Sequence, residues 1–122
     1  MDTRTFDTRT LRIRELNDAL RATFPYSFCN GKIVFTAQVY NLMGRDRDLF
    51  WKEVMNGVYG YDSFTEDNDP HGEHDMTFFE CHGESLFWKI DYYDLTLSRH
   101  SPDAADPSVT WRVLTVGFAE DY

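Results

Sequence analysis

Apolar residues recur at helical spacing in two segments of the first half of the chain. A first helix is expected over residues 8–23, before Pro25, because a helix does not continue through a proline. A second helix is expected over residues 46–59, and Gly60 follows its end. The apolar positions are Leu11, Leu16, Ala19 and Leu20 in the first segment, and Phe50, Val54 and Val58 in the second.

Four other segments are rich in β-branched and aromatic residues, which favour strands. Residues 32–36 follow a turn at Asn30, and residues 109–118 form the last such segment. Residues 76–81 and 85–93 flank a short turn, so we expect them to form a β-hairpin. Side chains alternate between the two faces along the second hairpin strand. Trp88, Ile90 and Tyr92 form the expected core face, and the opposite face is a mixed one formed by Phe87, Lys89, Asp91 and Tyr93.

Together these elements predict one α+β domain over residues 1–122, with an antiparallel sheet of about four strands and two helices packed on one face. The strands and helices do not alternate as they do in parallel βαβ folds. A chain of 122 residues is long enough to bury a core without disulfides. Cys29 and Cys81 lack the spacing of a redox or zinc motif, so we expect free thiols in a reducing cytoplasm, with a disulfide as the alternative.

Charge is distributed unevenly along the chain, which has a net charge of −9. Residues 1–60 carry 9 basic and 7 acidic side chains, a net of +2, whereas residues 61–122 carry 3 and 14, a net of −11. An acidic surface repels phosphates, which argues against direct nucleic-acid binding, and it attracts basic protein surfaces. The polar start of the chain, and the lack of an apolar run of about 20 residues, predict a cytoplasmic protein without a membrane span.

The segment Phe64–Asp75 (FTEDNDPHGEHD) concentrates carboxylates and two histidines, and it allows more than one interpretation. As a metal site it would use His71, His74 and Asp75, although the HxxHD spacing differs from the helical HExxH of zinc proteases. As an acid/base site it offers histidine, but no nucleophile or phosphate-loop motif accompanies it. As a structural loop it would form Asx turns before Pro70, and no cofactor is expected.

Three runs of sequence resemble the family called domain of unknown function 3768: FTEDNDPHGEHDMTFFE from Phe64, FWKIDYYD from Phe87 and SPDAADPSVTWRVLTVGFAEDY from Ser101. The runs IRELNDALR and KIVFT are similar to the start of that family, so the likeness covers nearly the whole chain. Ala104 stands where the resemblance implies a proline, and residues 39–61 are less similar than the rest.

The resemblance implies a fold unit but no established activity. Small acidic bacterial proteins of this kind resemble accessory products of plasmids and other mobile elements, a context that suits an inhibitor of a host defence complex, such as an anti-CRISPR protein. We therefore expect a non-enzymatic module, monomeric or homodimeric, that binds a basic protein surface on a nucleic-acid-handling complex. Two alternatives stay open: a small metal-dependent or acid/base enzyme centred on the loop, and a homodimer that buries Phe87 and Tyr93.

The expected contact surface combines acidic side chains, which set orientation and rate, with aromatic ones, which supply contact area. Charge reversal at Asp67 and Asp69 is expected to slow association and to leave the fold intact. The expected contact residues are Asp62, Phe64, Glu66, Asp67, Asp69, Glu73, Asp75, Tyr93, Asp103 and Asp106, with Glu80 and Glu84 as neighbouring charges and Tyr61 and Trp111 as further aromatics.

Overall fold

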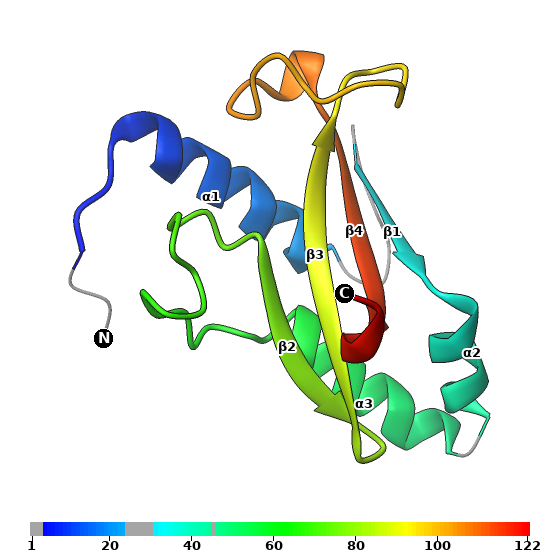
Figure 1. Cartoon of the computed structure of the whole chain (residues 1–122). Helices are drawn as coiled ribbons and strands as arrows, with labels where there is room; N and C mark the ends of the chain where they lie inside the picture. Colours follow the sequence, from blue (N-terminus) through cyan, green and yellow to red (C-terminus); the bar gives the residue numbers. More distant parts are fainter. Residues whose placement is uncertain (1–3, 24–30, 45) are drawn as a thin grey trace.

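The computed structural model describes residues 4–23, 31–44 and 46–122, and over these residues the chain forms an α+β fold (Figure 1). The expectations for Pro25, Cys29 and Asn30 lie outside the described residues. The elements are the helices α1 (Thr8–Ala22), α2 (Ala37–Met43) and α3 (Arg47–Val58), the strands β1 (Gly31–Phe35), β2 (Met76–Cys81), β3 (Glu84–Tyr93) and β4 (Trp111–Phe118), and the 3-10 turns η1 (Pro107–Val109) and η2 (Ala119–Asp121).

Both predicted helices are present, and an aspartate caps the start of each. The side chain of Asp7 accepts a hydrogen bond from the Thr10 amide, and that of Asp46 accepts one from the Leu49 amide. The buried face of α3 is the predicted one. The buried face of α1 differs from the prediction, because Leu11 is exposed and two polar side chains take part. The buried residues of α1 are Ile13, Asn17, Leu20 and Arg21.

The sheet has the strand order β1-β4-β3-β2. The predicted hairpin of β2 and β3 is confirmed, and β4 pairs antiparallel with β3. The prediction of an antiparallel sheet with two helices was wrong in two respects. First, β1 runs parallel to β4, with Gly31 opposite Arg112. Second, α2 is a third helix in the described part of the chain, and its two buried apolar residues are too few to form a visible helical period.

The core lies between the sheet and the helices. In Figure 1, α1 and α3 lie behind the sheet. Trp88 of β3 is fully buried at the centre, and its indole N–H donates to the carbonyl of Gly57 in α3 at 2.8 Å. Gly57 needs to lack a side chain, because the ring of Phe79 would lie 2.2 Å from a Cβ atom there. The predicted core face of β3 therefore packs directly against α3.

The opposite face of the sheet is covered in part by the C-terminal residues, since η2 lies in front of the sheet in Figure 1. The ring of Tyr122 contacts that of Phe87 with centroids 5.2 Å apart, and Phe87 is buried. Phe87 is thus already covered within its own chain, which weakens the argument for a homodimer through Phe87 and Tyr93. No helix in the described ranges has the length and apolar character needed to span a membrane.

Candidate functional site

Hydrogen bonds between polar groups of the loop between α3 and β2 fix the shape of that loop. The side-chain oxygen of Asn68 accepts a hydrogen bond from the Thr65 amide at 2.7 Å, and its amide nitrogen donates to the Ser63 carbonyl at 3.0 Å. The backbone amide of Asp69 donates to the Thr65 carbonyl at 2.8 Å, which closes a turn. The Asx turns predicted before Pro70 are therefore not the ones that form, because an Asx turn needs the side-chain oxygen to accept the amide two residues further on, whereas Asn68 accepts that of Thr65, three residues earlier.

Asp69 belongs to the interior of the loop. It is 0% exposed, and its Oδ1 accepts a hydrogen bond from the His74 amide at 3.2 Å. Its Oδ2 lies 3.8 Å from Nε2 of His74 and has no hydrogen-bond partner among the described residues. The prediction that Asp69 contacts a partner protein was therefore wrong, because its carboxylate is not accessible.

His74 connects the loop to helix α1. Its ring stacks on Phe64, with centroids 3.9 Å apart and planes 8° apart, and its Nδ1 lies 3.0 Å from Oδ1 of Asp18. Burial raises the pKa of Asp18, but hydrogen bonds from His74 and Arg21 outweigh that effect and lower it overall. Phe64 is only 7% exposed, so its predicted role as a surface aromatic was also wrong.

Arg21 completes this network from the same helix. Its guanidinium donates to the carbonyls of Val58 and Tyr61 at 2.8 and 2.9 Å, and to Asp18 at 2.9 Å. It also lies over the ring of Phe64, 5.1 Å from the centroid. Asp69, His74, Asp18 and Arg21 thus form a continuous chain of charged or polar groups from the loop to the end of α3.

A second buried network fixes the end of the loop. Asn17 is fully buried and donates to the Glu73 carbonyl at 3.0 Å and to the Tyr92 hydroxyl at 2.7 Å. Tyr92 donates to Oε1 of Glu73 at 2.9 Å, and Arg112 donates to Oδ1 of Asn17 at 2.8 Å. Burial raises the pKa of Tyr92 and lowers that of Arg112. This network was not predicted from the sequence, although Asn17 lies at helical spacing between the apolar Ile13 and Leu20, which was a usable signal.

The alternative metal ligands His71, His74 and Asp75 do not form a metal-binding group. Within the described ranges, no group of three or more histidine, cysteine, aspartate or glutamate side chains has an arrangement that holds a metal ion. Both ring nitrogens of His74 face carboxylates, and His71 is exposed. Cys81 is a free buried thiol, and burial followed by the charge of Glu53 raises its pKa to about 11, which opposes a role as nucleophile.

The remaining predicted contact residues differ in exposure and in partners. Three acids of the loop are exposed, and within the described part of the chain no side chain donates a hydrogen bond to them: Asp62, Glu66 and Asp67. Glu73, Asp75 and Tyr93 are half-buried. Asp103 pairs with Arg9 at 3.2 Å, and Asp106 accepts a hydrogen bond from the Ser108 amide, so both are engaged within the chain.

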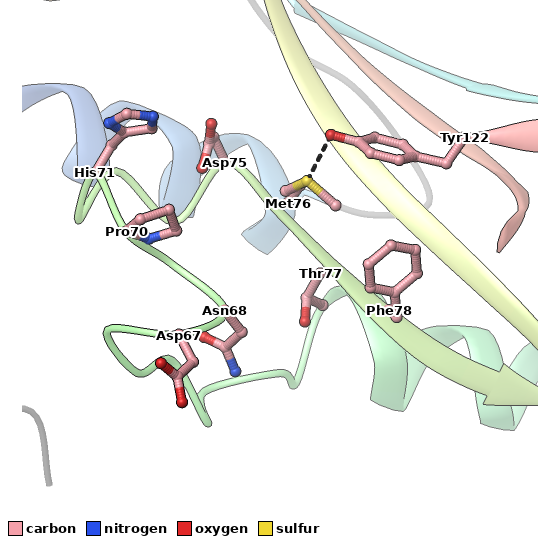
Figure 2. A pocket seen from close by; sticks show the side chains of 9 residues that line it. All are labelled: Asp67, Asn68, Pro70, His71, Asp75, Met76, Thr77, Phe78 and Tyr122. Carbon is pink, nitrogen blue, oxygen red and sulfur yellow. Dashed lines mark hydrogen bonds between the residues drawn. The ribbon is translucent and has the colours of Figure 1, made fainter.

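A pocket of about 420 Å³ lies between this loop and β2 (Figure 2). The loop contributes Asp67, His71 and Asp75, among others, and the C-terminal Tyr122 reaches the pocket from the other side, where its hydroxyl contacts Sδ of Met76 at 3.0 Å. The pocket is lined by Asp67, Asn68, Pro70, His71, Asp75, Met76, Thr77, Phe78 and Tyr122.

Comparison with known proteins adds a family. The model of the family described as "Protein of unknown function (DUF3768)" matches residues 35–121. This range includes the loop, every residue of the pocket lining except Tyr122, and the strands β2, β3 and β4. The chain belongs to the DUF3768 family. No curated protein and no solved structure matches the chain significantly. The DUF3768 match begins after α1, although Asn17, Asp18 and Arg21 of that helix hold the matched loop in place.

Gly72 offers a test of how firmly the loop is packed. A Gly72→Ala variant is expected to lose about 2–5 kcal/mol of unfolding free energy, and a Gly83→Ala variant about 1–2 kcal/mol. Both glycines have a positive φ, 73° and 76°, so both variants carry left-handed backbone strain. A Cβ on Gly72 would also lie 2.3 Å from the ring of Phe6, whereas one on Gly83 meets nothing within 4 Å. Urea unfolding measures the difference, and equal losses would disprove a tight Phe6 contact.

Proposed function

We propose that the chain is a non-enzymatic protein-binding module whose acidic loop binds a basic surface on a partner protein. One observation carries this proposal: the polar residues of the loop divide into two sets. Asn68, Asp69 and His74 hold the loop in one shape, and Asp62, Glu66 and Asp67 stand exposed on it without hydrogen-bond donors among the described side chains. A pre-shaped surface with unpaired charges suits recognition, because little ordering is needed on binding.

The long-range charge of the molecule supports the same function. Residues 61–122 carry a net charge of −11, and the first half carries +2. An asymmetric field of this kind steers a basic partner toward the acidic side and accelerates association. The exposed aromatic rings of Phe78 and Tyr122 beside the loop supply apolar contact area, which charged groups alone do not provide.

A narrower form of the proposal is that the partner belongs to a nucleic-acid-handling complex, and that binding inhibits it as an anti-CRISPR protein would. Its support is chemical: lysine and arginine surfaces that bind phosphates also bind clustered carboxylates. An acid/base enzyme is the second candidate, because His71 and Asp75 line the same pocket. Turnover of a small molecule that is lost in a His71→Ala variant would favour the enzyme.

The proposal predicts the effect of charge reversal on partner capture. A variant with Asp62→Lys and Glu66→Lys is expected to lose most of the partner that the immobilised wild-type chain captures from cells of its native host. The reason is that two exposed negative charges become positive and repel the basic surface. With the captured protein purified, the association rate should fall at least about tenfold, and it should also fall steeply as salt is raised from low to physiological concentration.

The matched control carries the same change in net charge elsewhere. Glu15→Lys with Asp48→Lys alters two exposed acids, one on α1 and one on α3, and both lie outside the loop. This variant should keep the association rate within about twofold of wild type at physiological salt, where charges farther apart than the Debye length of about 8 Å are screened. Equal losses in both variants would contradict a specific role of the loop and indicate a response to net charge alone.

A further inference from the structure

The pocket beside β2 is open at the edge of the sheet. In the strand order, β2 is an outer strand, so no further strand among the described elements covers its free side. Alternation along β2 places Met76 and Phe78 on the face that Tyr122 covers and Thr77 on the helix face. All three residues line the pocket, so the pocket extends around this edge, where a partner can reach it.

The polar part of the pocket carries the carboxylates of Asp67 and Asp75, and His71 is the single basic side chain among its lining residues. Asp67 is exposed and Asp75 is half-buried, and no described side chain donates a hydrogen bond to either carboxylate. Burial is the largest cause that raises the pKa of Asp75, and the charges of Glu73 and Asp69 raise it further, whereas a backbone hydrogen bond and the charge of His71 lower it in part. A cation bound beside Asp75 would relieve this accumulation of negative charge.

The apolar part of the pocket consists of accessible aromatic rings. Phe78 is 49% exposed and Tyr122 is 63% exposed, and their rings meet edge to face with centroids 5.7 Å apart. Large exposed aromatic side chains beside a pocket mark a contact site more clearly than scattered single ones do. The volume of about 420 Å³ is near the lower end of the range of about 300–1,000 Å³ for ligand pockets, which suits a single long side chain.

We propose that this pocket receives an arginine side chain of the partner protein, with the guanidinium at Asp75, the methylene stem along Phe78 and Tyr122, and Asp67 adding attraction at the entrance. This inference rests on the proposed function, since it names the group by which a basic partner is bound. Arginine fits better than lysine because its planar guanidinium pairs with carboxylates through several donors and also packs on aromatic rings. The ammonium group of lysine is compact and strongly hydrated, so it gains less contact energy from aromatic rings than a guanidinium does.

A titration of the full ¹⁵N-labelled chain with N-acetyl-arginine methylamide tests the inference without the partner. Backbone amide signals of residues 67–69, 71–78 and Tyr122 should shift with a Kd of about 1–10 mM, as expected for one small ligand group. N-acetyl-norleucine methylamide, which has no charge, should not shift these signals at the same ionic strength, and the lysine analogue should bind at least about threefold more weakly.

Two charge-removing variants and one control locate the binding. Asp75→Asn should weaken arginine binding about tenfold, and Asp67→Asn about two- to threefold because Asp67 is exposed. Asp48→Asn, a change to an exposed acid on α3 that does not line the pocket, should bind as wild type. Tyr122→Ala tests the contribution of the aromatic rings and should also weaken binding; because Tyr122 covers Phe87, urea unfolding of this variant is measured beside the titration.

The outcomes separate this inference from the proposed function. The inference is overturned if arginine shifts no signals in the pocket, if norleucine shifts them equally, or if Asp75→Asn binds as tightly as wild type. The proposed function has its own readout in the Asp62 and Glu66 reversal, which leaves the pocket lining intact. Loss of partner capture in that variant, with no arginine binding in the titration, would retain the protein-binding function and reject the pocket as its anchor.

Discussion

An Asp69→Lys variant is expected to lose about 3–5 kcal/mol of unfolding free energy, enough to unfold a substantial fraction of a marginally stable domain. Asp69 is 0% exposed, and its carboxylate accepts the backbone amide of His74 and faces the ring of that residue. A lysine there would remove the acceptor and bury an uncompensated cation beside the ring of His74. Equilibrium urea unfolding, followed by tryptophan fluorescence, measures the loss.

Asp67→Lys is the matched control, because it reverses an equal charge two positions away on the same loop. Asp67 is exposed and accepts no hydrogen bond from a described side chain, so its variant should stay within about 0.5 kcal/mol of wild type. Equal stability of the two variants would mean that the buried carboxylate of Asp69 does not hold the loop. The pair also separates folding from binding, since a loss of partner binding in Asp69→Lys would report unfolding.

Arg21→Met is expected to destabilise the fold by about 3–5 kcal/mol, although methionine retains the length of the apolar stem. The guanidinium of Arg21, which is 5% exposed, satisfies the carbonyl of Val58, the last residue of α3, and the carbonyl of Tyr61. The final carbonyls of a helix have no partner within it, so the loss of Arg21 leaves polar groups buried without hydrogen bonds. The variant also removes the donor to Asp18, which in turn contacts His74.

Arg12→Met serves as the control on the same helix. Arg12 pairs with Glu15 at 2.8 Å on the exposed side of α1, where ion pairs contribute about 0–1 kcal/mol. Thermal and urea unfolding should therefore place this variant within about 1 kcal/mol of wild type. A loss in Arg21→Met no larger than this would show that water replaces the guanidinium at the two carbonyls, and that α1 does not depend on it.

The regular elements were predictable because their signals are local. Phe50, Val54 and Val58 mark α3 by spacing alone, and the alternation around Trp88 marks the hairpin and its core face. By contrast, α2 was missed because a seven-residue helix with two buried apolar side chains, Val39 and Leu42, leaves too short a pattern.

The candidate site was less predictable, because burial of its polar residues depends on contacts between distant segments. Asp67 and Asp69 are the same residue type two positions apart, yet one is exposed and the other fully buried. The difference arises from α1: Asp18, which accepts a hydrogen bond from Arg21, contacts the ring of His74, and the backbone amide of His74 donates to Asp69. Apolar periodicity ignores polar side chains, so it assigned the inner face of α1 to leucines and overlooked Asn17 and Arg21.

The parallel pairing of β1 with β4 determines when the sheet of this protein can be completed during synthesis. Gly31 lies beside Arg112 and Phe35 beside Val116, so the first strand has no neighbour in the sheet until the last strand has been synthesised. Contacts between such distant positions are slow to form, because a long loop must close, with a loss of chain entropy, before the strand contacts contribute favourable free energy. While the chain is still being synthesised, β1 and the apolar side chains beside it therefore stay exposed. At that stage a chaperone, or the β4 strand of a second copy of the chain, competes with the chain's own β4 for this exposed strand.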